Sequence, residues 1–226
     1  MPARGSGGTA CARRCGRARG RPRAGRTAKA SRFGPHPGSF TVSCSGNLSQ
    51  SVRAYLSFGG TAVNGSDYES LPTSITLPAG VGSTNISFVP RANALPVGDK
   101  TVVVSIATNS AYTLGALASA SITLADLPMN NWRLQCFGTN AGNPAIAGDT
   151  ANPSGDGIPN LLKYALGLDP AQVQEHPVLD SWVDRDGCFL LSYTRPDPPP
   201  LDIGYQVEAS DTLVPWIKEA YPAAAG

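Results

Sequence analysis

The sequence predicts an all-β protein whose main body is an antiparallel sandwich. Segments in which every second residue is apolar recur roughly every 10–15 residues between residues 39 and 126, and the turn residues Gly, Pro and Asn separate them. Only 15% of the residues are charged, while the chain contains 25 Gly and 20 Pro. This composition is typical of short strands joined by turns and unlike that of long helices. A short helix and a second, smaller β-region are expected after the sandwich.

Six segments carry the strand pattern, and nothing in 39–126 has a helical period. In 51–58, for example, the apolar residues fall on one face, as in a half-buried strand. The predicted strands are 39–46, 51–58, 74–80, 83–90, 100–109 and 119–126. Their inward positions predict a core between two sheets, formed by Val52, Leu56, Phe58, Ile75, Leu77, Ile86, Phe88, Val102, Val104, Ile106, Ile122 and Leu124.

Two turns and the end of the last strand keep a specific order and spacing: GTAVNGSDY at 60–68, LPAG at 77–80 and TLAD at 123–126. Together with the strands between them, they resemble one Calx-beta domain over about residues 38–126. The resemblance implies an immunoglobulin-like sandwich, with a calcium site at its rim in some members. The family's first strand should precede Gly38. Because SRFGPHPGS does not supply that strand, we expect the domain to be clipped at its front edge.

The resemblance also implies where a calcium site of the sandwich would lie. Asp67 and Asp126 remain at the rim, but the likely ligand positions between them hold Asn93, Val97 and Lys100. Calcium takes about six to eight oxygen ligands, so we expect a vestigial rim site that binds the ion weakly or not at all. An alternative role for Asp67 is to bond backbone amides within its own turn. The next residue, Tyr68, would place its ring in the core and its hydroxyl at the rim.

The second half contains a loop with the spacing of a calcium loop. Oxygen-bearing side chains stand at positions 1, 3, 5 and 9, a backbone carbonyl is expected at position 7, and the turn glycine Gly157 stands at position 6. The weak candidate ligands are Asn152, Ser154, Asp156, Ile158 and Asn160. The loop resembles the DPDGDGxxNxxEYxxGxDP element of bacterial secreted proteins, akin to dockerin and thrombospondin type 3 loops. Its closing glutamate is Lys163 here, so we expect either weak calcium binding or a metal-free loop held by hydrogen bonds.

Further elements follow this loop. The segment NLLKYALG predicts a short helix that ends at Gly167. Two strand-like segments, VLDSWV and CFLLSY, flank Asp186-Gly187, which predicts a hairpin turn. We therefore divide this half into a linker with the degenerate loop and helix (127–170) and a partial β-region (171–226).

The first 37 residues are predicted to form a disordered basic head. Ten of the 18 basic residues lie in 1–32, without an acid, so the rest of the chain carries eight basic against 16 acidic residues. This segment has almost no large apolar residue to bury. One interpretation is a nucleic-acid arm, although no aromatic residues interleave for base stacking. The other is a linker or a mis-assigned start of the gene.

The five cysteines do not indicate a site. Cys44, Cys136 and Cys188 stand where a strand pattern would put small buried residues. Cys11 and Cys15 have no further ligands nearby that would complete a zinc site. The sequence leaves open whether any of them pair.

No motif of catalysis is present. His36 and His176 have no nucleophile motif around them, and the phosphate-, dinucleotide- and zinc-protease motifs are absent, as is any run of about 18 apolar residues. We therefore expect no enzyme, no nucleic-acid partner, no membrane span and no cofactor beyond weak calcium. The predicted function is that of a non-catalytic structural or adhesion module, extracellular or at the cell surface, within a larger secreted protein. Its partners would be neighbouring domains, another protein or a glycan. The alternatives are a calcium-stabilised binding module and an accessory region of a secreted hydrolase.

Overall fold

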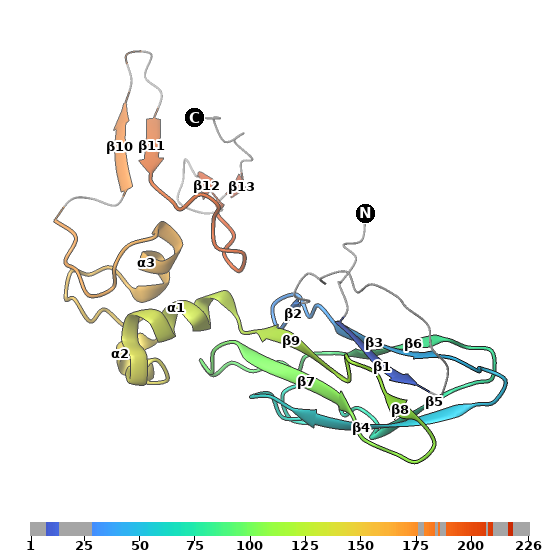
Figure 1. The fold of residues 1–226 in the computed structure, drawn as a ribbon. Helices are drawn as coiled ribbons and strands as arrows, with labels where there is room; N and C mark the ends of the chain where they lie inside the picture. The colour runs from blue at the N-terminus through green and yellow to red at the C-terminus, as the bar shows by residue number, and fades with distance from the viewer. Residues whose placement is uncertain are drawn as a thin grey trace.

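The chain folds into a β-sandwich followed by a smaller unit that contains the helices (Figure 1). These features are seen in a computed structural model that describes residues 8–13, 29–175, 179–183, 185, 189–206, 208–209 and 217–218. The predicted fold class is confirmed: an immunoglobulin-like sandwich comes first, and a short helix and small β-sheets follow it.

The sandwich consists of a four-stranded and a five-stranded sheet, with the strand orders β6-β3-β1-β8 and β2-β9-β7-β4-β5. Neighbouring strands are antiparallel, except that β1 runs parallel to β3 and β2 runs parallel to β9. The strands are β1 (Gly8–Arg13), β2 (Lys29–Ser31), β3 (Gly38–Ser45), β4 (Val52–Gly59), β5 (Ser74–Leu77), β6 (Ser83–Phe88), β7 (Lys100–Ile106), β8 (Thr113–Leu114) and β9 (Ser119–Ala125). The six predicted strands correspond to β3, β4, β5, β6, β7 and β9.

The core between the sheets follows the predicted alternation. In β3, buried and half-buried residues alternate along the whole strand. Of the twelve predicted core residues, all are buried except Phe58 and Ile75, which are half-buried against the core. Aromatic rings fill its centre: the Phe88 ring lies 5.9 Å from that of Phe40 and 5.0 Å from that of Tyr68. Tyr68 is fully buried and its hydroxyl has no partner among the described residues, so the expected rim position of that hydroxyl is wrong.

The sandwich begins earlier than the predicted boundary at residue 38. Strand β2 pairs with β9, Ala30 is fully buried, and Arg32 is buried beside them. Residues 8–13 and 29–37 therefore belong to the sandwich rather than to a disordered head, and the expected loss of the front strand is corrected. Three residues are too few to show a period of two, so the sequence pattern could not reveal this strand. Residues 1–7 and 14–28 lie outside the described residues.

The second unit is built from α1 (Pro128–Phe137), η1 (Gly138–Asn140), α2 (Pro144–Ala147) and α3 (Asn160–Leu166), with the paired strands β10 (Leu179–Val183) and β11 (Phe189–Tyr193) and the short pair β12 (Glu208–Ala209) and β13 (Ile217–Lys218). The predicted helix is α3, and Gly167 caps it in the left-handed conformation, as expected. The predicted hairpin strands pair antiparallel, while the turn at 186–187 lies outside the described residues.

Helix α1 was not predicted, because its polar and apolar residues show no helical period. It places Cys136 on an exposed helical surface, so the expectation of a buried strand cysteine is wrong there. Cys44 is buried in β3, as expected, and both of these thiols are free; Cys188 lies outside the described residues. None of the helices in the described part of the chain has the length and apolar character needed to cross a membrane.

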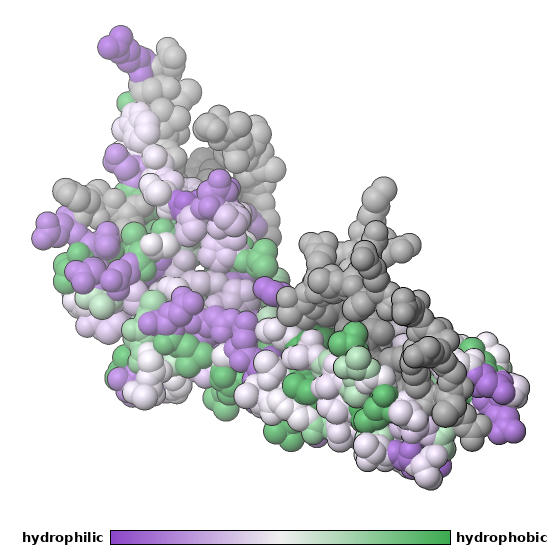
Figure 2. Space-filling model, viewed as in Figure 1, coloured by the Kyte–Doolittle hydropathy of each residue, from purple (hydrophilic) through white to green (hydrophobic). Residues whose placement is uncertain are grey.

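The surface is mixed in character. On the face drawn in Figure 2, apolar patches lie over both the sandwich and the helical unit, and polar side chains separate them. The large apolar residues that are exposed include Val63, Leu95, Leu117, Leu161 and Leu201, which come from different loops and elements. Apolar residues scattered in this way are ordinary for a protein surface and do not by themselves indicate an interface.

Candidate functional site

The structure places two ionic centres at the positions where calcium sites were sought. We call the group of Arg32, Asp67, Lys100 and Asp126 the rim centre, since it lies where loops of the sandwich meet α1. We call the group formed by Lys163, Asp156, Ser154 and the carbonyl of Gln172 the loop centre.

Arg32 is the middle of the rim centre. Its side chain is fully buried directly after β2. The guanidinium Nη2 lies 2.6 Å from Asp67 Oδ1, and Nη1 lies 3.4 Å from Asp126 Oδ1. Its Nε donates to the Arg91 carbonyl at 3.3 Å. One fixed cation therefore lies between the two carboxylates that the sequence singled out.

Asp67 is held by more than Arg32. Lys100 Nζ lies 2.7 and 2.9 Å from its two oxygens, and the Val63 amide donates to Oδ2 at 2.8 Å. The last bond confirms that Asp67 binds an amide of its own turn. Burial opposes ionisation of this carboxyl, but the hydrogen bonds from Lys100 and Val63 and the charge of Arg32 outweigh it. Together they hold the Asp67 pKa below its ordinary value of 3.8.

Asp126 ties the rim centre to the loop before β7. Its Oδ2 accepts the amides of Val97 at 3.1 Å and Gly98 at 2.9 Å, and its Oδ1 accepts the amide of Leu127. Of the three likely ligand positions named from the sequence, Lys100 joins the centre by its side chain and Val97 by its backbone. The third, Asn93, instead accepts the amide of Leu95 in its own turn.

The loop centre is organised around Lys163, the residue at position 12 of the loop. Its Nζ lies 2.7 Å from Asp156 Oδ2, 2.6 Å from Ser154 Oγ and 2.7 Å from the Gln172 carbonyl. An ammonium has three N–H donors, so these three acceptors satisfy it completely. The Lys163 side chain is fully buried. Gly157, with φ +82°, makes the sharp turn expected at position 6.

Both oxygens of the Asp156 carboxylate also have partners in this part of the chain. Its Oδ1 accepts the amide of Ile158 at 2.9 Å, and its Oδ2 accepts that of Gln174 at 3.1 Å in addition to Lys163. Desolvation opposes ionisation, but the hydrogen bonds from Lys163, from the two amides and from Ser154 prevail. They hold the Asp156 pKa well below its ordinary range.

Asn152 and Asn160 make hydrogen bonds of their own, although Asn160 Oδ1 is buried without a partner among the described residues. Asn152 Oδ1 accepts the Gly155 amide at 3.1 Å and the Ser154 hydroxyl at 3.2 Å. The Asn160 amide group donates to the carbonyls of Ile146 and Gly148, at 2.8 and 3.0 Å. Ser154 and Asp156 are thus brought together, while the side-chain nitrogen of Asn160 binds the end of α2. Hydrogen bonds link these side chains to one another and to the neighbouring backbone.

Sequence reasoning missed two members of these centres. Arg32 was assigned to the basic head, although the expectation of a strand before residue 38 was a signal that could have drawn it into the sandwich. Gln172 contributes only its carbonyl, which no side-chain pattern can reveal. Lys163 was identified as a lost ligand, but not as a cation that takes part in the site.

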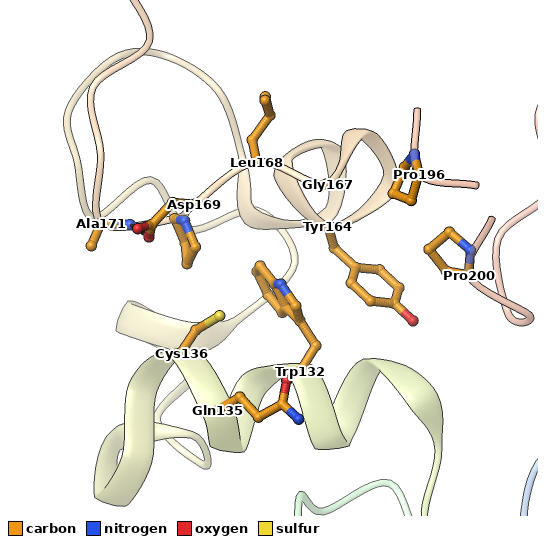
Figure 3. A pocket seen from close by; sticks show the side chains of 11 residues that line it. Trp132, Gln135, Cys136, Tyr164, Gly167, Leu168, Asp169, Ala171, Pro196 and Pro200 are labelled. Carbon is orange, nitrogen blue, oxygen red and sulfur yellow. Dashed lines mark hydrogen bonds between the residues drawn. The ribbon is translucent and has the colours of Figure 1, made fainter. Parts of the chain in front are cut away.

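A pocket of about 630 Å³ lies between α1 and the chain that follows α3 (Figure 3). Trp132 and Tyr164 point into it with ring centroids 5.3 Å apart, and Gln135, Cys136 and Asp169 stand around them. Desolvation and, to a lesser extent, the charge of Asp169 raise the pKa of the Cys136 thiol, which disfavours a reactive thiolate.

In the part of the chain that the structure describes, no three carboxylate, imidazole or thiol side chains lie close enough to share a metal ion. The backbone of His36 pairs with that of Ser31, and His176 lies outside the described residues.

Comparisons with known proteins give a limited likeness to solved structures. No family model and no curated protein matches the chain. The calcium-binding domain CBD12 of CALX1.1 is similar at 15% identity and a TM-score of 0.39, over 44% of this chain and 41% of that one. CBD12 from CALX1.2 matches at 16% and 0.39, over 43% and 41%, and the apo-form Calx CBD1 domain at 15% and 0.38, over 43% and 88%. The chain thus spans less than half the length of the two CBD12 structures.

Proposed function

We propose that this chain is a non-catalytic structural module of a larger extracellular protein, in which it acts as a stiff spacer between neighbouring domains. The observation that carries the proposal is the position of α1. Side chains of this helix contact both the sandwich and the helical unit. The two are therefore joined by a rigid element rather than by a flexible linker.

On the sandwich side, α1 continues from β9 after two residues and docks on the loop before β7. Asn130 Nδ2 donates to the Leu95 carbonyl at 3.0 Å, and Asn131 Nδ2 donates to Asp99 Oδ1 at 2.8 Å. A methyl of Leu134 lies 3.2 Å from where a Cβ on Gly98 would stand, so the helix approaches the loop closely. These contacts fix the direction in which the helix leaves the sandwich.

On the opposite side, α1 binds the helical unit. The Met129 amide donates to Asp202 Oδ2 at 2.9 Å, and the other oxygen of Asp202 accepts the Tyr164 hydroxyl at 2.7 Å. Trp132 packs against the ring of Tyr164, and Arg133 pairs with Asp149. Both units therefore share one helix, which supports a fixed angle between them.

A non-catalytic role is favoured by the way the buried acids are used. Asp67, Asp126 and Asp156 each have hydrogen-bonded or ionic partners on both carboxylate oxygens. A general acid or base needs a group free to exchange a proton with substrate. The extracellular setting is supported by the resemblance of the loop at 152–163 to an element of bacterial secreted proteins.

Relaxation of backbone ¹⁵N nuclei tests the spacer role. We expect the ordered amides of the sandwich and of α3 to report one common rotational correlation time. The variant Asn130→Ala/Leu134→Ala loosens the docked side of α1, and should make the two units tumble with different times. Two distinct correlation times in the unmodified chain would contradict the proposal.

Ligand binding is a second candidate function, favoured by the pocket in Figure 3. Aromatic faces with a few polar groups at the edge are typical of ligand pockets, and the Trp132 ring with the Gln135 amide suits a sugar ring. Binding would appear as saturable amide shifts confined to α1 and residues 167–171 on titration with oligosaccharides. The same titration of Gln135→Ala should show weaker binding, and unchanged spectra in both would exclude these ligands.

A further inference from the structure

The residues of the loop centre can be compared, position by position, with those of a twelve-residue calcium loop. In a twelve-residue calcium loop, side chains at positions 1, 3 and 5 point at the ion, and a glutamate at position 12 closes the site with both oxygens. Counted from Asn152, Ser154 is position 3, Asp156 is position 5 and Lys163 is position 12. The Lys163 ammonium contacts both of these side chains, at 2.6 and 2.7 Å. It therefore lies among the oxygens that would surround an ion.

The residues present do not fit calcium. The ion takes about six to eight oxygen ligands at about 2.3–2.6 Å, whereas this loop offers one carboxylate, which is already neutralised. The ammonium is fully buried and its three donors are satisfied. A divalent ion would have to displace it or lie beside a positive charge, and either arrangement is unfavourable.

The rim centre likewise pairs its carboxylates with side-chain cations. Its two carboxylates, from Asp67 and Asp126, face the buried guanidinium of Arg32, and Lys100 adds a second positive charge. Two acids are thus matched by two cations, so the four side chains of this group carry no net charge that would attract a divalent ion.

We propose that Lys163 and Arg32 are resident cations: each is a side chain of this protein that performs the charge-neutralising and shape-holding role that a bound calcium ion would otherwise perform. Lys163 is the determining residue in the loop. Replacing it with glutamate removes the resident cation and supplies the missing bidentate ligand in one step. The loop then becomes calcium-binding. This inference does not depend on the spacer role, because it concerns the origin of local order and not the coupling of the two units.

The test is calcium calorimetry on the whole chain and on Lys163→Glu. The unmodified chain should give no binding heat at millimolar calcium. Lys163→Glu should bind with a Kd of about 10⁻⁴–10⁻³ M, the range of extracellular calcium modules, and its melting temperature should rise with calcium. Two controls should stay unresponsive: Lys163→Gln, which removes the charge without adding a carboxylate, and Arg53→Glu, which makes the same charge change at an exposed site of β4.

Every outcome decides the proposal. Calcium binding by the unmodified chain, in the micromolar or the millimolar range, would overturn it, as would a response of Lys163→Glu no larger than that of the two controls. If Lys163→Glu is unfolded without calcium, a circular-dichroism titration replaces calorimetry. Recovery of the folded spectrum on addition of calcium would support the proposal, and no recovery at about 10 mM, tenfold above the weak limit of such sites, would contradict it.

Discussion

The rim centre and the loop centre use the same chemistry over very different spans of sequence. In the rim centre, Arg32 meets carboxylates that are 35 and 94 residues away along the chain. In the loop centre, Lys163 meets partners no more than nine residues away. The rim centre fastens an edge strand and a distant loop to the sandwich. The loop centre shapes a local turn before α3. The same kind of ionic contact therefore holds distant segments together in the rim centre and orders a local turn in the loop centre.

Buried ionic contacts make this comparison testable. Removal of one member leaves a charged partner in a poorly solvated site, which costs more than the pair itself contributes. The effect of a substitution should therefore spread as far as the contacts of its centre reach: across the sandwich for Arg32, and over the loop alone for Lys163.

The largest effect is expected from the packing of the sandwich, which sets the scale for both centres. Phe88 is buried against Phe40 and Tyr68. Phe88→Ala should lower the free energy of unfolding by about 3–5 kcal/mol, the range for core aromatics. Urea denaturation measures it. A loss below about 1 kcal/mol, as at surface sites, would show that the strand register is wrong.

Arg32→Met should come next, with a loss of about 3 kcal/mol, at the low end of the range for breaking a buried pair. The low end applies because Lys100 still pairs with Asp67. The loss should appear in unfolding of the whole sandwich. Arg53→Met is the matched control at an exposed position, where a change within about 0.5 kcal/mol is expected. Equal losses of stability in the two variants would show that the rim centre does not stabilise the sandwich.

Lys163→Met should have a local effect. We expect faster amide hydrogen exchange in residues 152–175, while β3 and β7 of the sandwich keep their protection, because partners of Lys163 all lie near the loop. Hydrogen exchange followed by mass spectrometry distinguishes the two regions. Uniform loss of protection over both regions would contradict the distinction between a local and a global centre.

The smallest effect is that of pH, and it acts on both centres in the same direction. The Asp67 and Asp156 pKa values lie below 3.8 in the folded chain. A depressed folded pKa stabilises the protein above the unfolded pKa, and this stabilisation is lost as the pH falls through the folded value. Melting temperature should therefore be steady from pH 7 to about pH 5 and fall below about pH 4. In Lys100→Met, the decline should be smaller, because the folded Asp67 pKa then lies closer to its unfolded value. An unchanged decline would show that Lys100 does not hold down the Asp67 pKa.

The sandwich could be predicted from the sequence because apolar residues recur at every second position of its longer strands. Alternation in β4, β6 and β7 identified both the strands and their buried faces, and the Asn-Gly and Gly turns marked where they end. The strands β1, β2 and β8 have only two to six residues each, and β1 and β2 also lie in the basic segment. They owe their places to tertiary pairing, which a local pattern does not contain.

The sequence named carboxylates that the structure brings together, but not the cations that lie beside them. Asp67 and Asp126 lie in one centre, as the resemblance implied, and Ser154 and Asp156 lie in the other. Ligand counting predicted weak calcium binding because acids were missing. It could not show that cations had taken their place, since that depends on where the Lys163 and Arg32 side chains point. Arg32 in particular reaches its partners only through the fold of the whole sandwich.

The central claim, that side-chain cations hold both centres, is tested most directly by thermal unfolding of the unmodified chain with calcium or with a chelator. A site with a Kd of about 1 mM would add about 1.4 kcal/mol at about 10 mM calcium, which raises the melting temperature of a chain of this size by about 3–6 °C. The account predicts the same melting temperature, within about 1 °C, in both conditions. A melting temperature that rises steadily with calcium concentration would contradict it.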